Sequence, residues 1–153
     1  MTACLAQLLI REVITTQENI PELNPSKIGL ITELKCITYL LEQGFNVLLP
    51  QGNYTKYDLV IEKEGRFYRI QCKHANPEEQ SFRVRTWYAI RGSSLKQIYT
   101  EKDCDYFMTE YNNQFYIFPI FGTTETKFWL ERKSCSNSKI AEDYLADKIL
   151  RTL

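Results

Sequence analysis

The sequence is poor in the residues that build zinc sites. It holds one histidine, His74, and its five cysteines lie far apart without a CxxC pair. Structural and catalytic zinc centres depend on clustered cysteine and histidine side chains, so this scarcity argues against a zinc site. An odd number of scattered cysteines also fits reduced thiols rather than a disulfide framework. We therefore expect a cytoplasmic protein without zinc.

Long apolar runs and an excess of one charge are also missing. No continuous apolar segment approaches the ~18 residues of a membrane-spanning helix. The N-terminus lacks the basic start and the apolar stretch of a secretory signal. We therefore expect no membrane partner. The 19 lysines and arginines balance 19 acidic residues, whereas a DNA-binding domain is usually more basic. A nucleic-acid partner would have to be bound by local basic patches.

What is present is enough material for one folded domain. The chain has 153 residues, of which 44% are hydrophobic, and this composition supports a core and argues against disorder. No internal repeat or long linker divides it, so we expect a single domain over residues 1–153. An amphipathic helix is predicted within residues 1–18, to pack on the domain or to contact another subunit. A second helix is predicted at about 138–150.

The segment 57–73 predicts two strands joined by a tight turn. If the turn consists of the two residues 64–65, the register places Asp58 directly opposite Gln71. A three-residue turn would shift this pairing by one residue. Gln71 and Lys73 are two residues apart, so their side chains share one face of the second strand. The two-residue register therefore brings three polar side chains together.

The preceding helix, predicted over residues 28–44, supplies a further acid. Its apolar stripe is predicted to face the core, and it consists of Leu30, Leu34, Ile37 and Leu41. Glu33 borders this stripe, where a carboxylate is costly to bury without a positive partner. Glu33 and Asp58 could together hold a divalent cation through the oxygen ligands that Mg²⁺ prefers. Gly29, one turn earlier, would let the helix approach another backbone closely.

A helix with Glu33, followed by Asp58–x₁₂–Gln71–x–Lys73 on a hairpin, resembles the PD-(D/E)xK nuclease superfamily. The resemblance covers about residues 26–75 by motif. It implies an α/β (α+β) fold with a restriction-endonuclease-like core, in which helices flank a mixed β-sheet. The catalytic core would span about residues 26–120.

The resemblance also implies roles for individual residues. Glu33, Asp58, Gln71 and Lys73 would be catalytic. Glu33 and Asp58 would bind Mg²⁺ or Mn²⁺ together with the backbone carbonyl of Cys72. A metal so held can lower the pKa of a bound water and offset charge on a phosphate, while Lys73 can position the attacking water or stabilise the transition state. Gln71 stands where the family's motif has an acid, and it brings no negative charge.

Within the superfamily, the chain is similar to the homing endonucleases that cyanobacterial group I introns carry in initiator tRNA genes, which share the glutamine. This similarity implies a site-specific double-strand break in an intronless tRNA gene, which promotes intron mobility. It also implies a homotetramer on double-stranded DNA. Self-association would let several small basic patches act together on one long site.

Candidate DNA contacts lie outside the motif. Residues 81–91 alternate between an apolar side and a side that carries Arg83 and Arg85, as in a strand with a basic outer face. Arginine reads guanine edges in the major groove, which admits a two-stranded ribbon. The alternative is an edge strand kept soluble by charge. The full set of expected DNA contacts is Lys56, Arg83, Arg85, Arg91 and Lys96.

Two other functions compete with a homing endonuclease. One is a Holliday junction resolvase-like nuclease, which would select four-way junctions with little sequence preference. The other is a catalytically silent DNA-binding module of the same fold, which Gln71 favours. Metal dependence separates a nuclease from a binder, and the form of the substrate separates the two nucleases.

Overall fold

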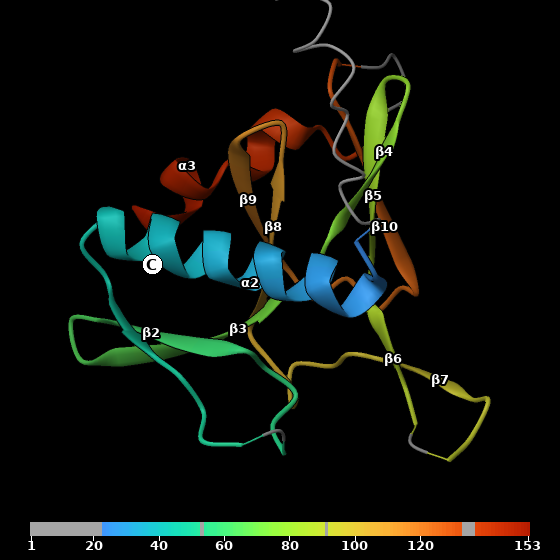
Figure 1. The fold of residues 1–153 in the computed structure, drawn as a ribbon. Coiled ribbons are helices and arrows are strands. Elements are labelled where there is room, and N and C mark those ends of the chain that lie inside the picture. Colours follow the sequence, from blue (N-terminus) through green and yellow to red (C-terminus); the bar gives the residue numbers. More distant parts are fainter. Residues whose placement is uncertain (1–22, 53, 91, 133–136) are drawn as a thin grey trace, which may run out of the picture.

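The computed structural model describes residues 23–52, 54–90, 92–132 and 137–153. The elements in chain order are α2 (Pro25–Glu42), β1 (Asn46–Leu48), β2 (Leu59–Lys63), β3 (Arg66–Cys72), β4 (Ala75–Glu78), β5 (Ser81–Arg85), β6 (Trp87–Ala89), β7 (Lys96–Ile98), β8 (Tyr106–Tyr111), β9 (Gln114–Pro119), β10 (Glu125–Trp129), the 3₁₀ helix η1 (Ala141–Tyr144) and α3 (Ala146–Leu150) (Figure 1). The helix predicted within residues 1–18 lies outside the described residues. In the described ranges, no helix is long and apolar enough to span a membrane.

The central feature is a five-stranded mixed sheet in the order β1-β2-β3-β8-β9. Its strands pair antiparallel except for β3 and β8, which run parallel. A separate three-stranded antiparallel sheet has the order β10-β5-β4, and β6 and β7 form a two-stranded ribbon. The predicted α+β fold with a mixed sheet is confirmed.

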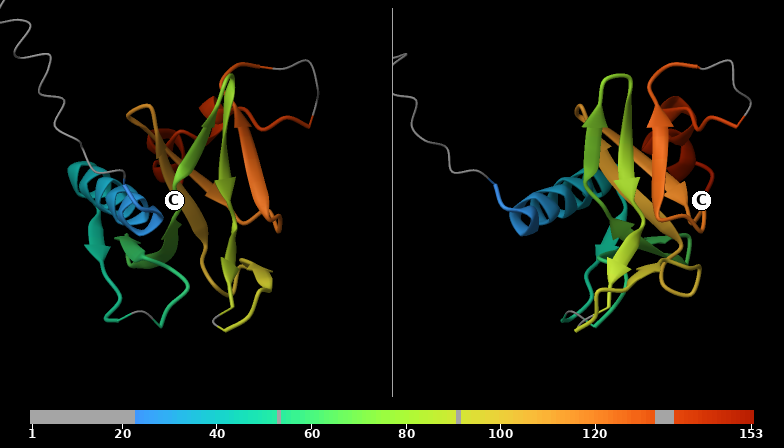
Figure 2. Two further views of the ribbon diagram at one scale, coloured as in Figure 1. Left: turned by 45° about the vertical axis from the view of Figure 1, so that its right-hand side comes forward. Right: turned by 90° about the vertical axis from the view of Figure 1, so that its right-hand side faces the viewer.

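The two faces of the central sheet pack against different layers. Helices α2 and α3 cover one face, and the three-stranded sheet packs on the other (Figure 2). Neighbouring strand residues point to opposite faces, so buried Met108 joins the helix-side core while buried Phe107 joins the core between the sheets. This arrangement leaves the start of β2 and the end of β3 on the side of the sheet near the start of α2.

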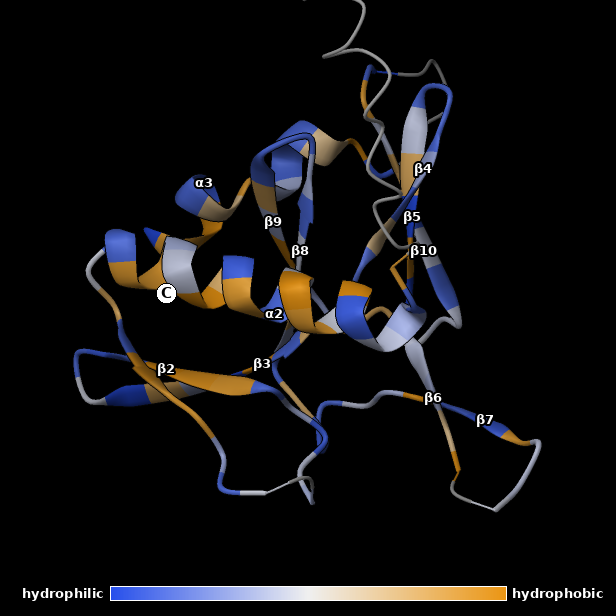
Figure 3. Ribbon diagram, viewed as in Figure 1, coloured by the Kyte–Doolittle hydropathy of each residue, from blue (hydrophilic) through white to orange (hydrophobic). Residues whose placement is uncertain are grey.

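Helix α2 buries a different face from the predicted one. Leu30, Leu34 and Leu41 are predicted to face the core but are 54%, 52% and 54% exposed, so the prediction is wrong for these three residues. Ile37, the fourth residue of the predicted stripe, is half-buried. The buried row is instead Thr32, Cys36 and Leu40. Thr32 and Cys36 are small, so this side of the helix can lie close to the sheet, and Leu40 completes the buried row; Leu30, Leu34 and Leu41 stay exposed. Apolar residues therefore run along much of α2, as its orange segments show (Figure 3).

The hairpin of β2 and β3 has the predicted register. Lys63 pairs with Arg66, and Glu64 and Gly65 have φ values of 54° and 78°. Positive φ at both turn residues is the signature of a type I′ turn, whose twist matches that of the flanking strands. The Gly65 N–H also donates a 2.7 Å hydrogen bond to the Glu62 carboxylate. The two-residue turn is confirmed.

Two elements differ from the sequence-based predictions. The single helix predicted at 138–150 is wrong, because Leu145 is extended between η1 and α3, with ψ of 131°, and bridges to Tyr116 of β9. Pairing with the sheet overrides the helical pattern there. From the sequence, residues 74–80 after the motif are predicted to form a turn, and this prediction is wrong: they contain β4, which pairs with β5.

Candidate active site

Asp58 is held in place by the strand that faces it. Its N–H donates to the Ile70 carbonyl at 2.9 Å. Its side-chain Oδ2 accepts two hydrogen bonds, from the Cys72 N–H at 2.8 Å and from the Gln71 Nε2 at 2.5 Å. The other oxygen, Oδ1, has no hydrogen-bond partner among the described residues. One carboxylate oxygen is thus anchored, and the other is available to a ligand.

The pKa values of both acids are raised, and the charge of Asp58 contributes to the shift of Glu33. Burial raises the pKa of Asp58, and hydrogen bonds from Cys72 and Gln71 together with the charge of Lys73 partly oppose this. Burial and the nearby charge of Asp58 raise the pKa of Glu33, which projects from α2. Two carboxylates close enough to repel each other are typical of a functional site, and a cation between them relieves the repulsion.

The Cys72 carbonyl faces the same place as Asp58. In a strand, the N–H and C=O of one residue point to the same side, and the Cys72 N–H points to Asp58. The carbonyl also accepts the Gln71 Nε2 at 3.1 Å. The Cys72 thiol behaves differently: a hydrogen bond with Cys36 and burial raise its pKa well above the usual range. The thiol therefore belongs to the core and not to the chemistry.

Gln71 is 7% exposed and uses its amide nitrogen fully on protein acceptors. The oxygen of the same amide remains available as a neutral ligand atom for a cation. Within the described part of the chain, no three or more His, Cys, Asp and Glu side chains cluster as metal ligands. The donor set is instead two carboxylates, an amide and a backbone carbonyl. These hard oxygens fit Mg²⁺, which keeps several waters of its own.

Lys73 follows directly and borders the acids. Its ammonium group donates a 3.1 Å hydrogen bond to the Tyr99 hydroxyl and lies 4.7 Å from the centre of that ring. Burial lowers the pKa of Lys73, and the charge of Asp58 opposes this effect. Tyr99 is 5% exposed. The sequence carries no signal for Tyr99, because it lies outside the motif and reads as an ordinary core aromatic.

An open cleft of about 410 Å³ adjoins Lys73. It lies between the start of α2 and the strands β4 to β6. Its lining residues are Pro25, Ile28, Gly29, Lys73, His74, Asn76, Arg85 and Trp87. The cleft combines cations, neutral hydrogen-bonding groups and one aromatic ring beside the candidate catalytic residues. It is therefore the place where a long anionic substrate would lie.

The two strand arginines have different surroundings. Arg83 is held in an ion pair with Glu78 at 2.6 Å and lies 3.4 Å from Glu125. Arg85 is 63% exposed, lies 3.9 Å from Glu125 and lines the cleft. The structure thus brings Arg85, but not Arg83, next to Lys73.

The remaining predicted DNA contacts lie around the β6–β7 ribbon. The Lys56 ammonium is 3.8 Å from the centre of the Tyr88 ring, and the Lys96 ammonium is 4.5 Å from that of Trp87. Both lysines are exposed. Arg91 lies outside the described residues.

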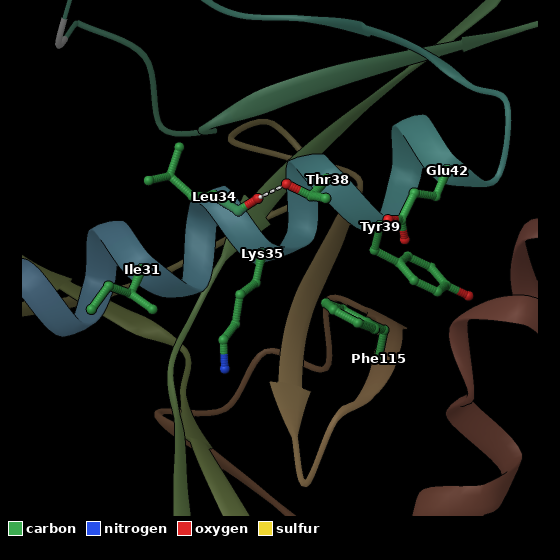
Figure 4. A pocket seen from close by; sticks show the side chains of 7 residues that line it. All are labelled: Ile31, Leu34, Lys35, Thr38, Tyr39, Glu42 and Phe115. Carbon is green, nitrogen blue, oxygen red and sulfur yellow. Dashed lines mark hydrogen bonds between the residues drawn. The ribbon is translucent and has the colours of Figure 1, made fainter.

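A second hollow, of about 330 Å³, lies on another side of α2 and contains none of the candidate catalytic residues (Figure 4). Ile31 and Leu34 contribute apolar surface there, and Tyr39 stacks on Phe115 with ring centres 4.2 Å apart. The Thr38 hydroxyl donates to the Leu34 carbonyl at 2.9 Å, so its polar atom is satisfied within the helix. This hollow is a mostly apolar surface rather than a reaction site.

The fold and the site define a nuclease of the restriction-endonuclease type. The sequence model of the family described as PD-(D/E)XK endonuclease matches residues 23–146, and the chain belongs to this family. The predicted superfamily is therefore confirmed.

One solved structure similar to this chain is "The structure of a bacterial homing endonuclease: I-Ssp6803I". The TM-score is 0.68 at 22% identity, over 84% of this chain and 93% of that chain. At this identity the likeness concerns the fold. No curated protein sequence matches the chain.

Proposed function

We propose that the protein is a site-specific homing endonuclease that makes a metal-dependent double-strand break in an intronless tRNA gene and so promotes intron mobility. It would act in the cytoplasm as a single endonuclease domain over residues 1–153. The observation that carries the proposal is the setting of Asp58. One carboxylate oxygen accepts hydrogen bonds from Gln71 and Cys72, and the other accepts none from the described residues. The charge of Asp58 acts on Glu33, and that of Lys73 acts on Asp58. The fold of a bacterial homing endonuclease supports the biological role.

Each residue has a defined part in phosphodiester hydrolysis. A divalent cation, Mg²⁺ or Mn²⁺, supplies when bound a Lewis acid that lowers the pKa of water and offsets phosphate charge. Asp58, Glu33 and the Cys72 carbonyl would hold it. Lys73 donates hydrogen bonds to the attacking water or to the phosphate oxygens. Gln71 orients Asp58, a task for which its amide donor suits it better than the acid of the usual motif.

Gln71 decides how the anionic charge of the site is distributed. A carboxylate at this position would face Asp58 at hydrogen-bonding distance and repel it. The amide instead donates at 2.5 Å. The site therefore keeps two acids, Glu33 and Asp58, which is enough for one hydrated Mg²⁺ that retains several waters.

The decisive experiment uses supercoiled plasmid that carries an initiator tRNA anticodon-stem sequence, with a matched plasmid that lacks it. We expect one linear product from the first plasmid, only with Mg²⁺ and not with EDTA. Lys73→Ala should abolish cleavage. Lys148→Ala, a control on α3 where the lysine pairs with Glu142 at 3.2 Å, should cut normally.

Other results would change the assignment. Cleavage of a synthetic four-way junction without cleavage of either plasmid would indicate a resolvase-like nuclease. Retention of the target plasmid in a gel shift, without cleavage of any substrate in Mg²⁺ or Mn²⁺, would indicate a silent DNA-binding module. The catalytic roles of Gln71 and Lys73 would then be withdrawn.

We further propose that the protein works as a homotetramer. The exposed leucines of α2, Leu30, Leu34 and Leu41, form an apolar row that the described residues leave uncovered, and the hollow at Tyr39 and Phe115 is also apolar. Apolar surfaces of this kind mark interaction sites. Self-association would also explain how a chain with no net charge binds DNA, because several basic clefts would act on one molecule.

A further inference from the structure

Gly29 stands near the start of α2 without a structural reason in the described part of the protein. Its backbone is helical and its φ is not positive, so any residue could adopt it. Glycine inside a helix costs about 1 kcal/mol relative to alanine. A Cβ at this position would meet no atom of the described residues within 4 Å. The predicted close approach of another protein backbone is therefore wrong for the described ranges.

The surroundings of Gly29 lie on the side of the active site. Gly29 lines the cleft that also contains Lys73 and Arg85. It precedes Glu33 by four residues, so the two share a helix face and are separated by one turn, about 5.4 Å along the axis. A strand whose phosphate lies among Glu33, Asp58 and Lys73 would reach Gly29 within about one nucleotide along its chain.

We propose that Gly29 provides the clearance through which the sugar–phosphate backbone of the cleaved DNA strand passes along α2. The inference rests on the proposed nuclease function and names how that site admits its substrate. With no side chain at Gly29, the wall of the cleft is bare helix backbone at this position, and the strand lies against it. Lys73 and Arg85 then supply the cations that an anionic backbone requires.

The opposite wall fits the same ligand. Asn76 and His74 offer neutral hydrogen-bonding groups, and Trp87 offers an apolar ring for a sugar or base. The cleft therefore pairs two cations with neutral donors, which suits a phosphodiester chain.

The test is a series of replacements at Gly29 by alanine, serine and valine in the full-length protein. Binding of a labelled target duplex is measured by fluorescence anisotropy with Ca²⁺ in place of Mg²⁺, and stability by thermal unfolding. Alanine has the best helix propensity of the three, so Gly29→Ala should unfold at a higher temperature than the wild type. We expect it nevertheless to bind DNA about tenfold more weakly.

The graded series separates clearance from helix stability. Under the proposal, the wild type binds most tightly although it unfolds at a lower temperature than Gly29→Ala, and affinity then falls with side-chain volume from alanine to serine to valine. Wild-type affinity in Gly29→Ala, or affinity that follows thermal stability across the series, would overturn this inference alone. A wild-type protein that neither binds nor cuts duplex DNA would overturn both this inference and the proposed function.

Discussion

The Gln71 amide donates a 2.5 Å hydrogen bond to Oδ2 of Asp58, across the paired strands β2 and β3. The residue that takes the place of an acid in the motif is therefore a donor to the acid that remains. This relationship orients Asp58 and lowers the number of negative charges that a cation must balance.

Gln71→Glu should make the folded protein depend on a divalent cation. The hydrogen bond to Asp58 becomes a repulsion between carboxylates, and removing such a donor from a buried acceptor costs about 1–3 kcal/mol. We expect a lower unfolding temperature in EDTA and recovery in Mg²⁺. Gln71→Met is the control, because it loses the hydrogen bond without adding charge and should not recover. Equal unfolding temperatures for wild type and Gln71→Glu in EDTA would contradict the role assigned to Gln71.

Asp58→Asn should separate stability from activity. Burial raises the pKa of Asp58 above its ordinary value of 3.8. Between the unfolded and the folded pKa, the folded state therefore holds a proton that the unfolded state has released. The resulting stabilisation is complete below the ordinary pKa and is lost as the pH rises through the folded pKa. The variant should lack this decline in the free energy of unfolding, and at neutral pH it should be more stable than the wild type. Denaturant unfolding of the wild type and the variant from pH 3 to 7 measures the free energy of unfolding of each protein.

The same variant should lose cleavage by more than about a hundredfold, which exceeds the usual loss for a residue that only supports a metal ligand. The asparagine oxygen can still accept from Gln71 and Cys72, so the local structure is kept. A variant that cuts normally would remove Asp58 from the site. A free energy of unfolding that declines with rising pH over that range, as in the wild type, would show that another group causes the trend.

Arg85→Ala and Arg83→Ala should affect different properties. Arg85 lines the cleft, so its removal should weaken binding of duplex DNA and reduce the slope of log affinity against log salt by about one. Arg83 is held by Glu78, and its loss should cost about 0.2–1 kcal/mol of stability with the salt slope unchanged. Fluorescence anisotropy titrations of duplex DNA at several salt concentrations measure the affinity and the salt slope of each variant. A reduced salt slope for Arg83→Ala instead would place the DNA on the three-stranded sheet.

Leu34→Glu should disrupt self-association. Leu34 is 52% exposed in the single chain, so a carboxylate is tolerated there, whereas it would be buried in an apolar contact between chains at high cost. Light scattering after size-exclusion chromatography should show a homotetramer for the wild type and a smaller species for the variant. Lys102→Glu, an exposed change outside α2, is the matched control and should stay tetrameric. A tetramer that persists in Leu34→Glu would place the contact elsewhere.

The hairpin shows how far local sequence reaches. Gly65 readily takes the positive φ that a type I′ turn requires at its position, while Glu64 adopts a φ of 54° that is uncommon for its residue type. The register that places Asp58 against Gln71 follows from this two-residue turn. The spacing of Gln71 and Lys73 then sets their common face. These features, and with them the nuclease motif, are readable in the sequence because each depends on neighbours a few residues away.

Only the tertiary structure decided which sides of the elements meet. Helix α2 has apolar residues on two faces, and the sheet packs against the row of Thr32, Cys36 and Leu40. The small side chains of Thr32 and Cys36 allow close packing there. Leu145 left the helical pattern to bridge with β9. Arg83 and Arg85 share one face of a strand, yet Glu78 and Glu125 hold the first while the second lines the cleft. Such choices depend on partners distant in the chain, so periodicity and motif alone could not determine them.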